Sequence, residues 1–344
     1  MNAQNNPAPA GAPPSPVIIF ETFNAYQRSA ALRAAIELDV FSPIGRGDRT
    51  AAAIGKACSA AERGLRILCD YLVVIGLLTK SHDAYALTPE SAAFLDKRSP
   101  AYMGGAVRFM HGETIHAAFA KLTDAVRNGG TAVPADGTVA PDHPVWVDFA
   151  RDMAPLMAMP AELLAALVDP NPTTPLKVLD ISASHGLYGL AFARRNLAAR
   201  VVANDWPAVL KVAQEAAERF GLTDRFSTIP GSAFEVDFGR DYDVILLPNF
   251  LHHFDPAGCA KLLGKIHAAL KPGGRVVVLE FIPEPDRVSP PPSAMFALTM
   301  LATTPAGDAY TYAEYESMLR NAGYLRSELH PLPPTMQRVV KGYK

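Results

Sequence analysis

The stretch Lys177-Val-Leu-Asp-Ile-Ser-Ala-Ser-His-Gly186 is the part of the sequence that decides the fold. An apolar run typical of a buried strand passes into a loop of small residues, and helical spacing begins at Leu187. This order is typical of the first strand, loop and helix of a doubly wound α/β domain. Ligands of such domains lie beyond the carboxyl ends of the strands, so we expect this loop to touch a ligand.

The sequence after Pro175 continues to alternate between strand and helix patterns, which indicates a mostly parallel sheet. The predicted strands are 177–181, 200–204, 226–230, 243–247 and 275–281, with two closing strands near 325–330 and 337–343. The predicted helices are 187–194, 208–220, 256–270 and 312–322. Residues 170–344 are therefore expected to form a Rossmann-like α/β domain.

The preceding part, residues 17–169, is expected to be a mainly helical domain of winged-helix type. Helical spacing covers 20–38 and is predicted to end before Pro43. Two helices follow, 51–57 with Thr50 as N-cap and 61–75 with Ser59 as cap, and then two short strands at 77–80 and 84–87. Helix, helix and hairpin is the winged-helix order. Further helices are expected within 102–128 and 145–167, on either side of a Gly/Pro-rich loop, and the Pro-rich segment 169–175 is the predicted domain boundary.

Charge narrows the classes of function. The 344 residues carry a net charge of −2 and the sequence pI is about 6.5, whereas nucleic acids and anionic membranes attract a concentrated basic face. Winged helices often bind DNA, which keeps that alternative open. The charged residues of the second helix cancel one another, so we favour a packing or dimerisation module and expect no nucleic-acid or membrane partner; they are Glu62, Arg63, Arg66 and Asp70.

The cysteines and the N-terminus indicate a reducing, cytoplasmic location. Cys58, Cys69 and Cys259 are far apart and form no CxxC spacing, which disfavours a disulfide framework or a zinc site. Residues 1–16 are rich in Ala, Pro and Asn and have no apolar run of the signal-peptide kind, so a disordered tail is expected.

Asp205 is the first candidate ligand-binding residue outside the loop. It lies 19 residues after Gly186, at the end of the second predicted strand. A carboxylate at that place can accept hydrogen bonds from both hydroxyls of a ribose. The alternative is that Asp205 merely caps the helix that begins near Pro207.

Several motifs together resemble the family of two-domain, S-adenosylmethionine-dependent O-methyltransferases that act on small molecules in plants and in bacterial secondary metabolism. Besides the winged-helix order, they are Val178-Leu-Asp-Ile-Ser-Ala-Ser-His-Gly186, Asn204-Asp-Trp-Pro207, Pro230-Gly-Ser-Ala-Phe234, Asn249-Phe-Leu-His-His-Phe254 and Leu270-Lys-Pro-Gly-Gly-Arg-Val-Val-Val-Leu-Glu280. The resemblance implies S-adenosylmethionine as cofactor, a small-molecule acceptor, and a homodimer formed through the N-terminal domain.

The resemblance also implies roles for individual residues. The family's catalytic base is a histidine in a His-Asp-Trp-like motif, a position that His252 occupies here, and Glu280 matches the supporting carboxylate. His253 could equally be the base or contact substrate, and the alternative for both histidines is that they are solvated residues before the next helix. The expected cofactor-binding residues are Asp180, Ser182, Ser184, His185, Gly186, Asp205, Trp206, Gly231, Ser232, Ala233, Phe234 and Pro248. The expected acceptor-binding residues are Phe109, Met110, His111, Trp146, Phe149, Met153, Asn249, His253, Met295, Phe296 and Met300. No metal is expected, because no carboxylate or thiolate ligands flank the two histidines.

Three departures from the family pattern affect these expectations. Ser182 and Ser184 stand where the family's loop has glycines, and either hydroxyl could hydrogen-bond the carboxylate of the cofactor. Ser232-Ala233 replaces an acidic-hydrophobic pair, so the adenine contact is expected to differ. A further carboxylate is missing before Thr311, because Ala309 occupies its place and Asp308 is out of register.

The chemistry expected of these residues is methyl transfer to a hydroxyl. A phenol has a pKa near ~10, so a neutral imidazole within hydrogen-bond reach is a suitable proton acceptor. The prediction is an O-methyltransferase for a small, hydroxylated, aromatic acceptor. The alternatives are methyl transfer to nitrogen, carbon or carboxylate, and a non-catalytic regulatory protein that binds the cofactor.

Overall fold

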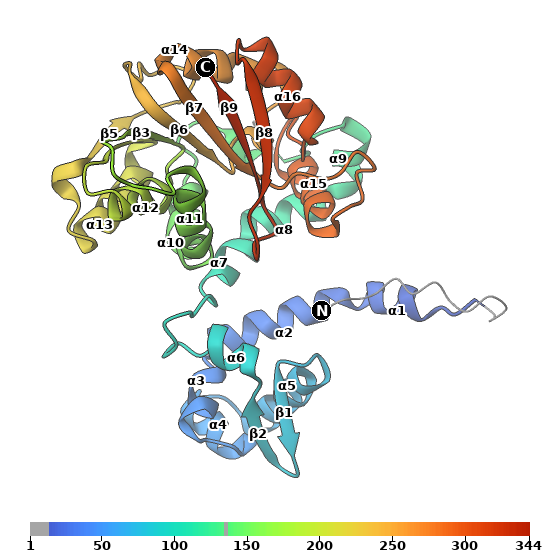
Figure 1. Ribbon diagram of the computed structural model, residues 1–344. Helices are drawn as coiled ribbons and strands as arrows, with labels where there is room; N and C mark the ends of the chain where they lie inside the picture. The colour runs from blue at the N-terminus through green and yellow to red at the C-terminus, as the bar shows by residue number, and fades with distance from the viewer. Residues whose placement is uncertain (1–13, 134–136) are drawn as a thin grey trace. The chain divides into compact units, whose positions relative to one another are not determined.

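The computed structural model describes residues 14–133 and 137–344, which form two compact units that divide between Gly104 and Gly105 (Figure 1). The helices between residues 105 and 168 therefore belong to the same unit as the sheet. The boundary predicted at residues 169–175 stays a prediction, and the predicted tail lies outside the described residues up to residue 13.

The first unit has the winged-helix order that the sequence predicts. Its elements are α1 (Val17–Phe23), α2 (Ala25–Glu37), α3 (Phe41–Arg46), α4 (Ala51–Ala57), α5 (Glu62–Val74), β1 (Leu78–Ser81), β2 (Ala84–Leu87) and α6 (Pro89–Phe94). The Thr50 side chain accepts a hydrogen bond from the Ala53 amide at 3.2 Å, which confirms it as the N-cap of α4. β1 and β2 pair antiparallel as the wing.

Two local predictions for this unit are wrong. Pro43 does not stop a helix but lies inside the first turn of α3, where a helical residue needs no N–H partner and proline is tolerated. Ser59 does not cap α5, because its φ is 53° in a tight turn and Ala61 is the N-cap without a side-chain bond.

The second unit is built on a seven-stranded sheet in the order β5-β4-β3-β6-β7-β9-β8. The strands are β3 (Lys177–Ile181), β4 (Arg200–Asp205), β5 (Phe226–Pro230), β6 (Tyr242–Pro248), β7 (Leu270–Glu280), β8 (Arg326–Pro331) and β9 (Arg338–Tyr343). The first five are parallel, and β9 runs antiparallel to both β7 and β8. The Rossmann-like prediction is thereby confirmed.

Helices cover both faces of this sheet (Figure 1). One face of the sheet, formed by alternate strand residues such as Val178 and Val244, is covered by α11 (Ala154–Val168), α12 (Leu187–Arg195) and α13 (Pro207–Arg219). The opposite face, formed by the intervening residues such as Leu179 and Ile245, is covered by α14 (Pro256–Ala269) and α16 (Tyr312–Asn321). Because both faces are buried, the parallel strands are almost continuously apolar, which is why they are recognisable in the sequence.

The remaining helices of this unit are α7 (Ala106–Met110), α8 (Glu113–Ala120), α9 (Leu122–Asn128), the 3₁₀ turn η1 (Gly137–Val139), α10 (Val145–Asp152) and α15 (Pro291–Thr303). The region predicted as one helix from 145 to 167 is two helices, and Met153 lies between them as the C-cap of α10 and the N-cap of α11. α15 was not predicted. Its start lies in a run of prolines, and prolines in the first turn lack only an N–H that has no helical partner there.

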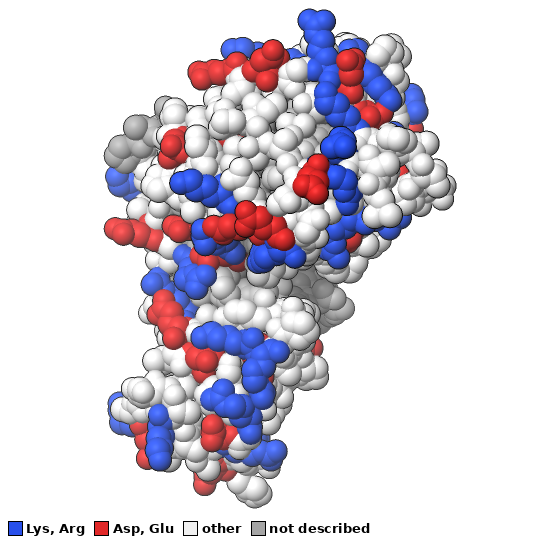
Figure 2. Space-filling view, turned by 90° about the vertical axis from the view of Figure 1, so that its left-hand side faces the viewer, with Lys and Arg blue, Asp and Glu red and all other residues white. Residues whose placement is uncertain are grey.

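No helix of the described residues is long and apolar enough to cross a membrane. Figure 2 shows basic and acidic side chains interspersed over the face that it presents.

Candidate active site

The candidate site lies at the switch in strand order, where the chain leaves β3 toward β4 on one side and returns through β6 on the other. The carboxyl ends of β3, β4, β6 and β7 meet at this edge, because the four strands are parallel. The loop 182–186 follows β3, and η3 (Leu251–His253) follows β6. The topology therefore brings Asp205, His252 and Glu280 to one edge of the sheet, as predicted.

The loop after β3 keeps a backbone that favours glycine although two of its residues are serines. Ser182 and Ser184 have φ of 53° and 52°, and Gly186 has φ of 73°. Two backbone bonds hold this path: the Ala183 amide donates to the Asn204 carbonyl at 3.0 Å, and the Ser184 amide donates to Oδ2 of Asp205 at 2.8 Å. Left-handed residues other than glycine are strained, and they persist where surrounding contacts hold them.

Polar groups of this loop remain without partners in the described residues. Oγ of Ser184 and Oδ1 of Asp180 are buried and have no hydrogen bond to the described part of the chain. The other oxygen of Asp180 accepts from the Gly189 amide at 2.8 Å. Buried polar atoms are normally bonded, so an unpartnered hydroxyl beside the start of α12 is a place for a polar ligand group.

Burial shifts the titration of the groups around the loop. It raises the pKa of Asp180 to about 8 and that of Asp205 to about 6, although backbone N–H donors oppose both shifts. It lowers the pKa of His185 to about 4, so this imidazole is neutral near pH 7. Nδ1 of His185 accepts from the Leu187 amide at 3.1 Å, which assigns the ring proton to Nε2.

The loop after β5 is held close to the end of β4. Nδ2 of Asn204 donates to the carbonyls of Ile229 and Gly231 at 2.8 and 3.0 Å. Gly231 has φ of 122°, and a Cβ there would lie 2.8 Å from Val236. Oγ of Ser232 accepts from the Phe234 amide, and Nζ of Lys265 donates to the Ala233 carbonyl at 2.9 Å. The contacts of Asn204 and Lys265 were not predicted from the sequence, although Asn204 belongs to the Asn-Asp-Trp-Pro motif.

His252 and Glu280 form a buried pair. Nδ1 of His252 lies 2.5 Å from Oε2 of Glu280, and the side chains are 5% and 1% exposed. Oε1 of Glu280 accepts the amides of Phe250 at 3.0 Å and His252 at 3.4 Å. The predicted pair of a histidine and a supporting carboxylate is thus in direct contact.

The pair has one proton to lose near neutral pH. Burial raises the pKa of Glu280 and lowers the pKa of His252, because it disfavours the charged form of each group. The carboxyl and the imidazole are both uncharged below the pKa of Glu280. Above it, the carboxylate accepts the proton of Nδ1, and Nε2 of His252 carries a free lone pair. In that state the imidazole can take a proton from a ligand.

His253 is half-buried, and its imidazole is neutral near pH 7. Nδ1 of its ring donates to the Phe250 carbonyl at 3.1 Å, because a carbonyl can only accept. Burial lowers its pKa to about 3. The centroid of its ring lies 4.2 Å from the centroid of the His252 ring. The same ring packs edge-on against Trp146, with a centroid distance of 5.3 Å. Within residues 14–133 and 137–344, His253 contacts no carboxylate, in contrast to His252.

Aromatic side chains from α10 and α15 lie beside the two histidines, and a chain of ring contacts continues from α10 to Phe109 on α7. The ring centroids of Trp146 and Phe149 are 5.6 Å apart, and those of Phe149 and Phe109 are 5.0 Å apart. The ring of Phe296 packs edge-on against that of His252, with a centroid distance of 4.7 Å. Phe281, which was not predicted, stacks on Phe296 at 4.3 Å. Such a group of ring faces and edges suits a flat aromatic ligand.

The other predicted positions differ in their surroundings. Met110 and Met295 are exposed at 54% and 72%, whereas Met300 is buried. Nδ1 of His111 lies 3.2 Å from Nε2 of His116. Oδ1 of Asn249 accepts from Gln337 at 2.5 Å, a contact across 88 residues that no local sequence signal could indicate. The remaining predicted residues lie at the ends of helices or strands. Met153 is the N-cap of α11, Trp206 is the N-cap of α13, and Pro248 is the last residue of β6. Among the described residues, no group of three or more His, Cys, Asp or Glu side chains could hold a metal ion.

Comparison with known proteins agrees with this geometry. Residues 163–325 match the O-methyltransferase domain, and residues 20–97 match the O-methyltransferase dimerisation domain. The chain is 30% identical to the tetracenomycin polyketide synthesis 8-O-methyltransferase of Streptomyces glaucescens, over 89% of this chain and 90% of that one. It is 28% identical to the 3-hydroxy-5-methyl-1-naphthoate 3-O-methyltransferase of Streptomyces sahachiroi, over 91% and 92%. A crystal structure from Nostoc punctiforme, assigned as an O-methyltransferase, superposes with a TM-score of 0.94 at 55% identity, over 96% of this chain and 100% of that one. The chain belongs to the family of S-adenosylmethionine-dependent O-methyltransferases.

Proposed function

We propose that this enzyme methylates a hydroxyl group of a small aromatic molecule and that His252 is the general base. The contact between Nδ1 of His252 and Glu280, 2.5 Å long and buried, is the observation that carries the proposal. A base needs a fixed tautomer and a partner that stabilises its protonated form, and a carboxylate on Nδ1 supplies both.

The cofactor has a matching set of groups at the loop after β3. The sulfonium of S-adenosylmethionine supplies an activated methyl group. Ser184, whose hydroxyl lacks a partner in the described residues, and the amides at the start of α12 would hold the carboxylate of the methionine part. Asp205 would accept hydrogen bonds from the ribose hydroxyls, and Gly231 to Phe234 would border the adenine. The residues present therefore fit this cofactor.

The protein's part in the reaction is to align the acceptor and take its proton. With the cofactor bound, the methyl group would pass from the sulfonium sulfur, which leaves as a neutral thioether, to the hydroxyl oxygen, and Nε2 of His252 would accept the hydroxyl proton. The imidazolium that results is stabilised by the Glu280 carboxylate, which keeps the proton on Nδ1 in place. Proximity and orientation are expected to supply much of the remaining acceleration.

An aromatic acceptor is supported by the ring cluster beside the histidines, in particular Trp146 and Phe296. The indole of Trp146 is itself fixed, because its N–H donates to the Thr138 carbonyl at 2.9 Å. The two Streptomyces relatives are named for aromatic polyketide and naphthoate substrates. A fused-ring phenol is therefore the first acceptor to try.

We also propose that the enzyme is a homodimer through its N-terminal domain and has no nucleic-acid partner. The match to the dimerisation domain supports the dimer. Against DNA binding, two cations of this unit are engaged by one carboxylate: Arg66 pairs with Asp70 at 3.0 Å, and Lys80 of the wing pairs with the same carboxylate at 2.5 Å. A recognition helix needs free cations for phosphate.

The test is single-turnover methylation of a panel of naphthols, hydroxylated polycyclic aromatics, catechols and aromatic amines. With an accepted phenol, His252→Ala should reduce turnover by ~10²–10⁴. His330→Ala is the matched control, because His330 also pairs with a glutamate, Glu328, at 3.2 Å but lies on β8. Full activity of His252→Ala would defeat the proposal of this base, and methylation of the amines alone would replace O-transfer by N-transfer.

A further inference from the structure

Residues 304–311, here called the bracing segment, lie directly on the backbone that carries the proposed base. The Asp308 amide donates to the His252 carbonyl at 3.0 Å, and the Tyr310 hydroxyl donates to the Phe254 carbonyl at 2.6 Å. A Cβ on Gly307 would lie 2.2 Å from the His252 carbonyl oxygen. The segment therefore touches the backbone on both sides of His253 and leaves no space between.

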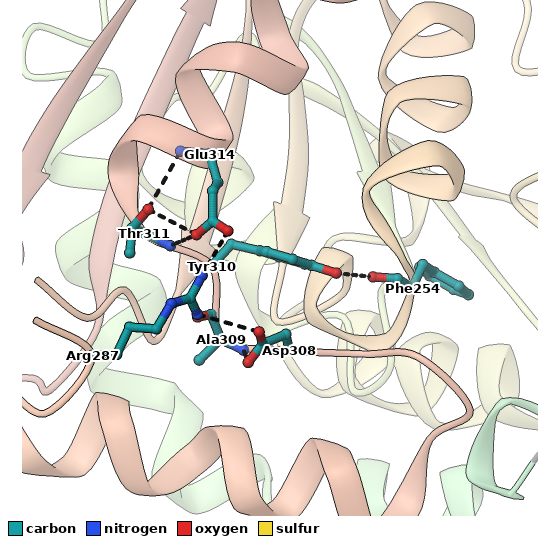
Figure 3. A network of polar contacts seen from close by, with 7 residues as sticks. All are labelled: Phe254, Arg287, Asp308, Ala309, Tyr310, Thr311 and Glu314. Atoms are coloured by element: carbon teal, nitrogen blue, oxygen red, sulfur yellow. Dashed lines mark hydrogen bonds and ion pairs between the residues drawn. The ribbon is translucent and has the colours of Figure 1, made fainter. Parts of the chain in front are cut away.

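Arg287 holds this segment from the outside (Figure 3). Its Nη1 donates to Oδ2 of Asp308 at 3.2 Å and to the Ala309 carbonyl at 3.3 Å. Its Nη2 pairs with Oε1 of Glu314 at 2.6 Å. One guanidinium thus ties the turn after β7 to the middle of the bracing segment and to the first turn of α16.

The far end of the bracing segment is fixed by the same glutamate. Oε2 of Glu314 accepts the amide and the hydroxyl of Thr311, both at 2.8 Å, in a capping box that begins α16. Because Glu314 binds Arg287 with one oxygen and Thr311 with the other, the segment is held at its middle and at its end by one connected network (Figure 3).

This arrangement gives Asp308 a part that the sequence did not predict. Its carboxylate binds Arg287 and its own neighbour's amide, and its backbone N–H is the group that contacts His252. The segment therefore acts on the base through the main chain, not through a second carboxylate.

We propose that Arg287 is a positioning residue, which holds the His252 imidazole in place for proton transfer by fixing the bracing segment. The inference rests on the proposed role of His252. Glu280 anchors the imidazole, and the bracing segment anchors the backbone that bears it. A shift of about 1 Å at a reacting group is enough to lower a rate by about 100-fold. None of the contacts of Arg287 reaches the loop after β3, so cofactor binding should not depend on it.

The first test separates turnover from binding. Arg287→Ala should lower kcat by about 10- to 100-fold and leave the calorimetric affinity for S-adenosylmethionine unchanged. Arg287→Lys should restore only part of the loss, because an ammonium cannot make the forked set of bonds. The matched control is Arg194→Ala, whose ion pair with Glu162 is equally exposed and joins α12 to α11. An unchanged kcat, or an equal loss in both variants, would overturn the proposal.

The second test needs neither acceptor nor cofactor. Amide hydrogen exchange at Asp308 and over residues 252–254 should be faster in Arg287→Ala than in the wild type, and unchanged in Arg194→Ala. Slow exchange at Asp308 in the Arg287→Ala protein would refute the bracing even if activity fell. If His252→Ala kept full turnover, the proposed base would fail, whereas the exchange result would still decide the role of Arg287 in bracing.

A glycine pair gives an independent check. Gly307→Ala places a methyl group against the His252 carbonyl and should lower kcat while Arg287 is intact. Gly264→Ala on α14, where a Cβ meets nothing within 4 Å, is its control and should have wild-type kcat. A Gly307→Ala enzyme with wild-type kcat and exchange would show that contact with the His252 backbone does not control the base.

Discussion

Single carboxyl groups of this site are buried deeply enough for protonation to control their function. Asp205 is 8% exposed, and burial raises its pKa to about 6. Its ionised form is the stronger acceptor for both ribose hydroxyls, because it can accept on both oxygens and the bonds are charge-assisted. Below pH 6 the free protein holds a proton on Asp205 that cofactor binding must displace.

The affinity for S-adenosylmethionine should therefore fall as the pH falls through about 6. At pH 5 about a tenth of the carboxyl groups are ionised, so the dissociation constant should be about tenfold larger than at pH 8. Asp205→Asn should bind more weakly, by about 2–3 kcal/mol, with no such pH dependence. Calorimetry at pH 5 and pH 8 measures both effects. A wild-type affinity that does not vary with pH would remove Asp205 from the ribose site.

Glu280 should control the pH dependence of turnover. The base-competent form of the pair has a carboxylate at Glu280 and a neutral His252, and the pKa of Glu280 is raised to about 8. Because the ionised form is the active one, the rate should rise with pH up to about 8 and then level off. His252 is expected to add no second change of rate above pH 5, because burial lowers its pKa.

The corresponding variant is Glu280→Gln. It should lose the rise of rate with pH and turn over more slowly than the wild type above pH 8, because an amide does not ionise and stabilises an imidazolium poorly. Single-turnover rates from pH 5 to 9 test this, with Glu328→Gln on β8 as the control. If the rate of Glu280→Gln rises with pH as in the wild type, Glu280 does not control the pH dependence of turnover.

At the scale of elements, the sequence predicted the sheet better than the helices around it. Strands β3 and β5 have the predicted bounds. β3 is recognisable because a strand buried on both faces is largely apolar, whereas the edge strand β5 is recognisable from its β-branched residues between turn residues. α15 was missed because its start is a run of prolines, and the same composition is typical of a loop.

The site could be predicted only in part, for a related reason. His252, Glu280 and Asp205 stand at strand ends, so topology alone brings them together. The bracing contacts of Arg287, and the bond from Gln337 to Asn249, join segments that are 21 to 88 residues apart. Such contacts depend on side-chain packing and leave no periodic signal in the sequence.

The junction of the β3 loop with α12 gives an element-scale prediction. Gly186 has φ of 73°, and a Cβ there would lie 2.9 Å from that of Ala213 on α13. Gly186→Ala combines backbone strain with a clash between two helices, so it should lower the free energy of unfolding by about 1–3 kcal/mol. It should also weaken cofactor binding, because the loop is displaced.

Urea unfolding and calorimetry measure these two quantities. Gly264→Ala is the control, because its Cβ would lie in open space within α14, where alanine is expected to stabilise the helix. If the Gly186→Ala protein is as stable as the wild type, α12 and α13 can move apart to accommodate the methyl group without a loss in the free energy of unfolding.

At the scale of the whole molecule, α1 is the feature that a single chain does not explain. None of its residues is buried. Its apolar side chains Val17, Ile18, Ile19, Phe20 and Phe23 are 53% to 68% exposed. A contiguous apolar surface of this kind is typical of an interface, and the match to the dimerisation domain begins at residue 20. A second copy of the chain is therefore the expected partner.

The wild type should behave as a dimer of the 36.8 kDa chain in light scattering at micromolar concentration. The double variant Phe20→Asp, Phe23→Asp should be a monomer, because two carboxylates would have to lose their hydration in the apolar contact, which costs several kcal/mol unless they are paired. Leu325→Asp, which changes an 84% exposed residue of the sheet unit, should stay dimeric. A monomeric wild type would defeat the dimer itself. A dimeric double variant would instead place the contact on other residues of the N-terminal domain. Burial of apolar surface stabilises an interface by roughly 25 cal/mol per Å², and α1 would then supply little of that buried surface.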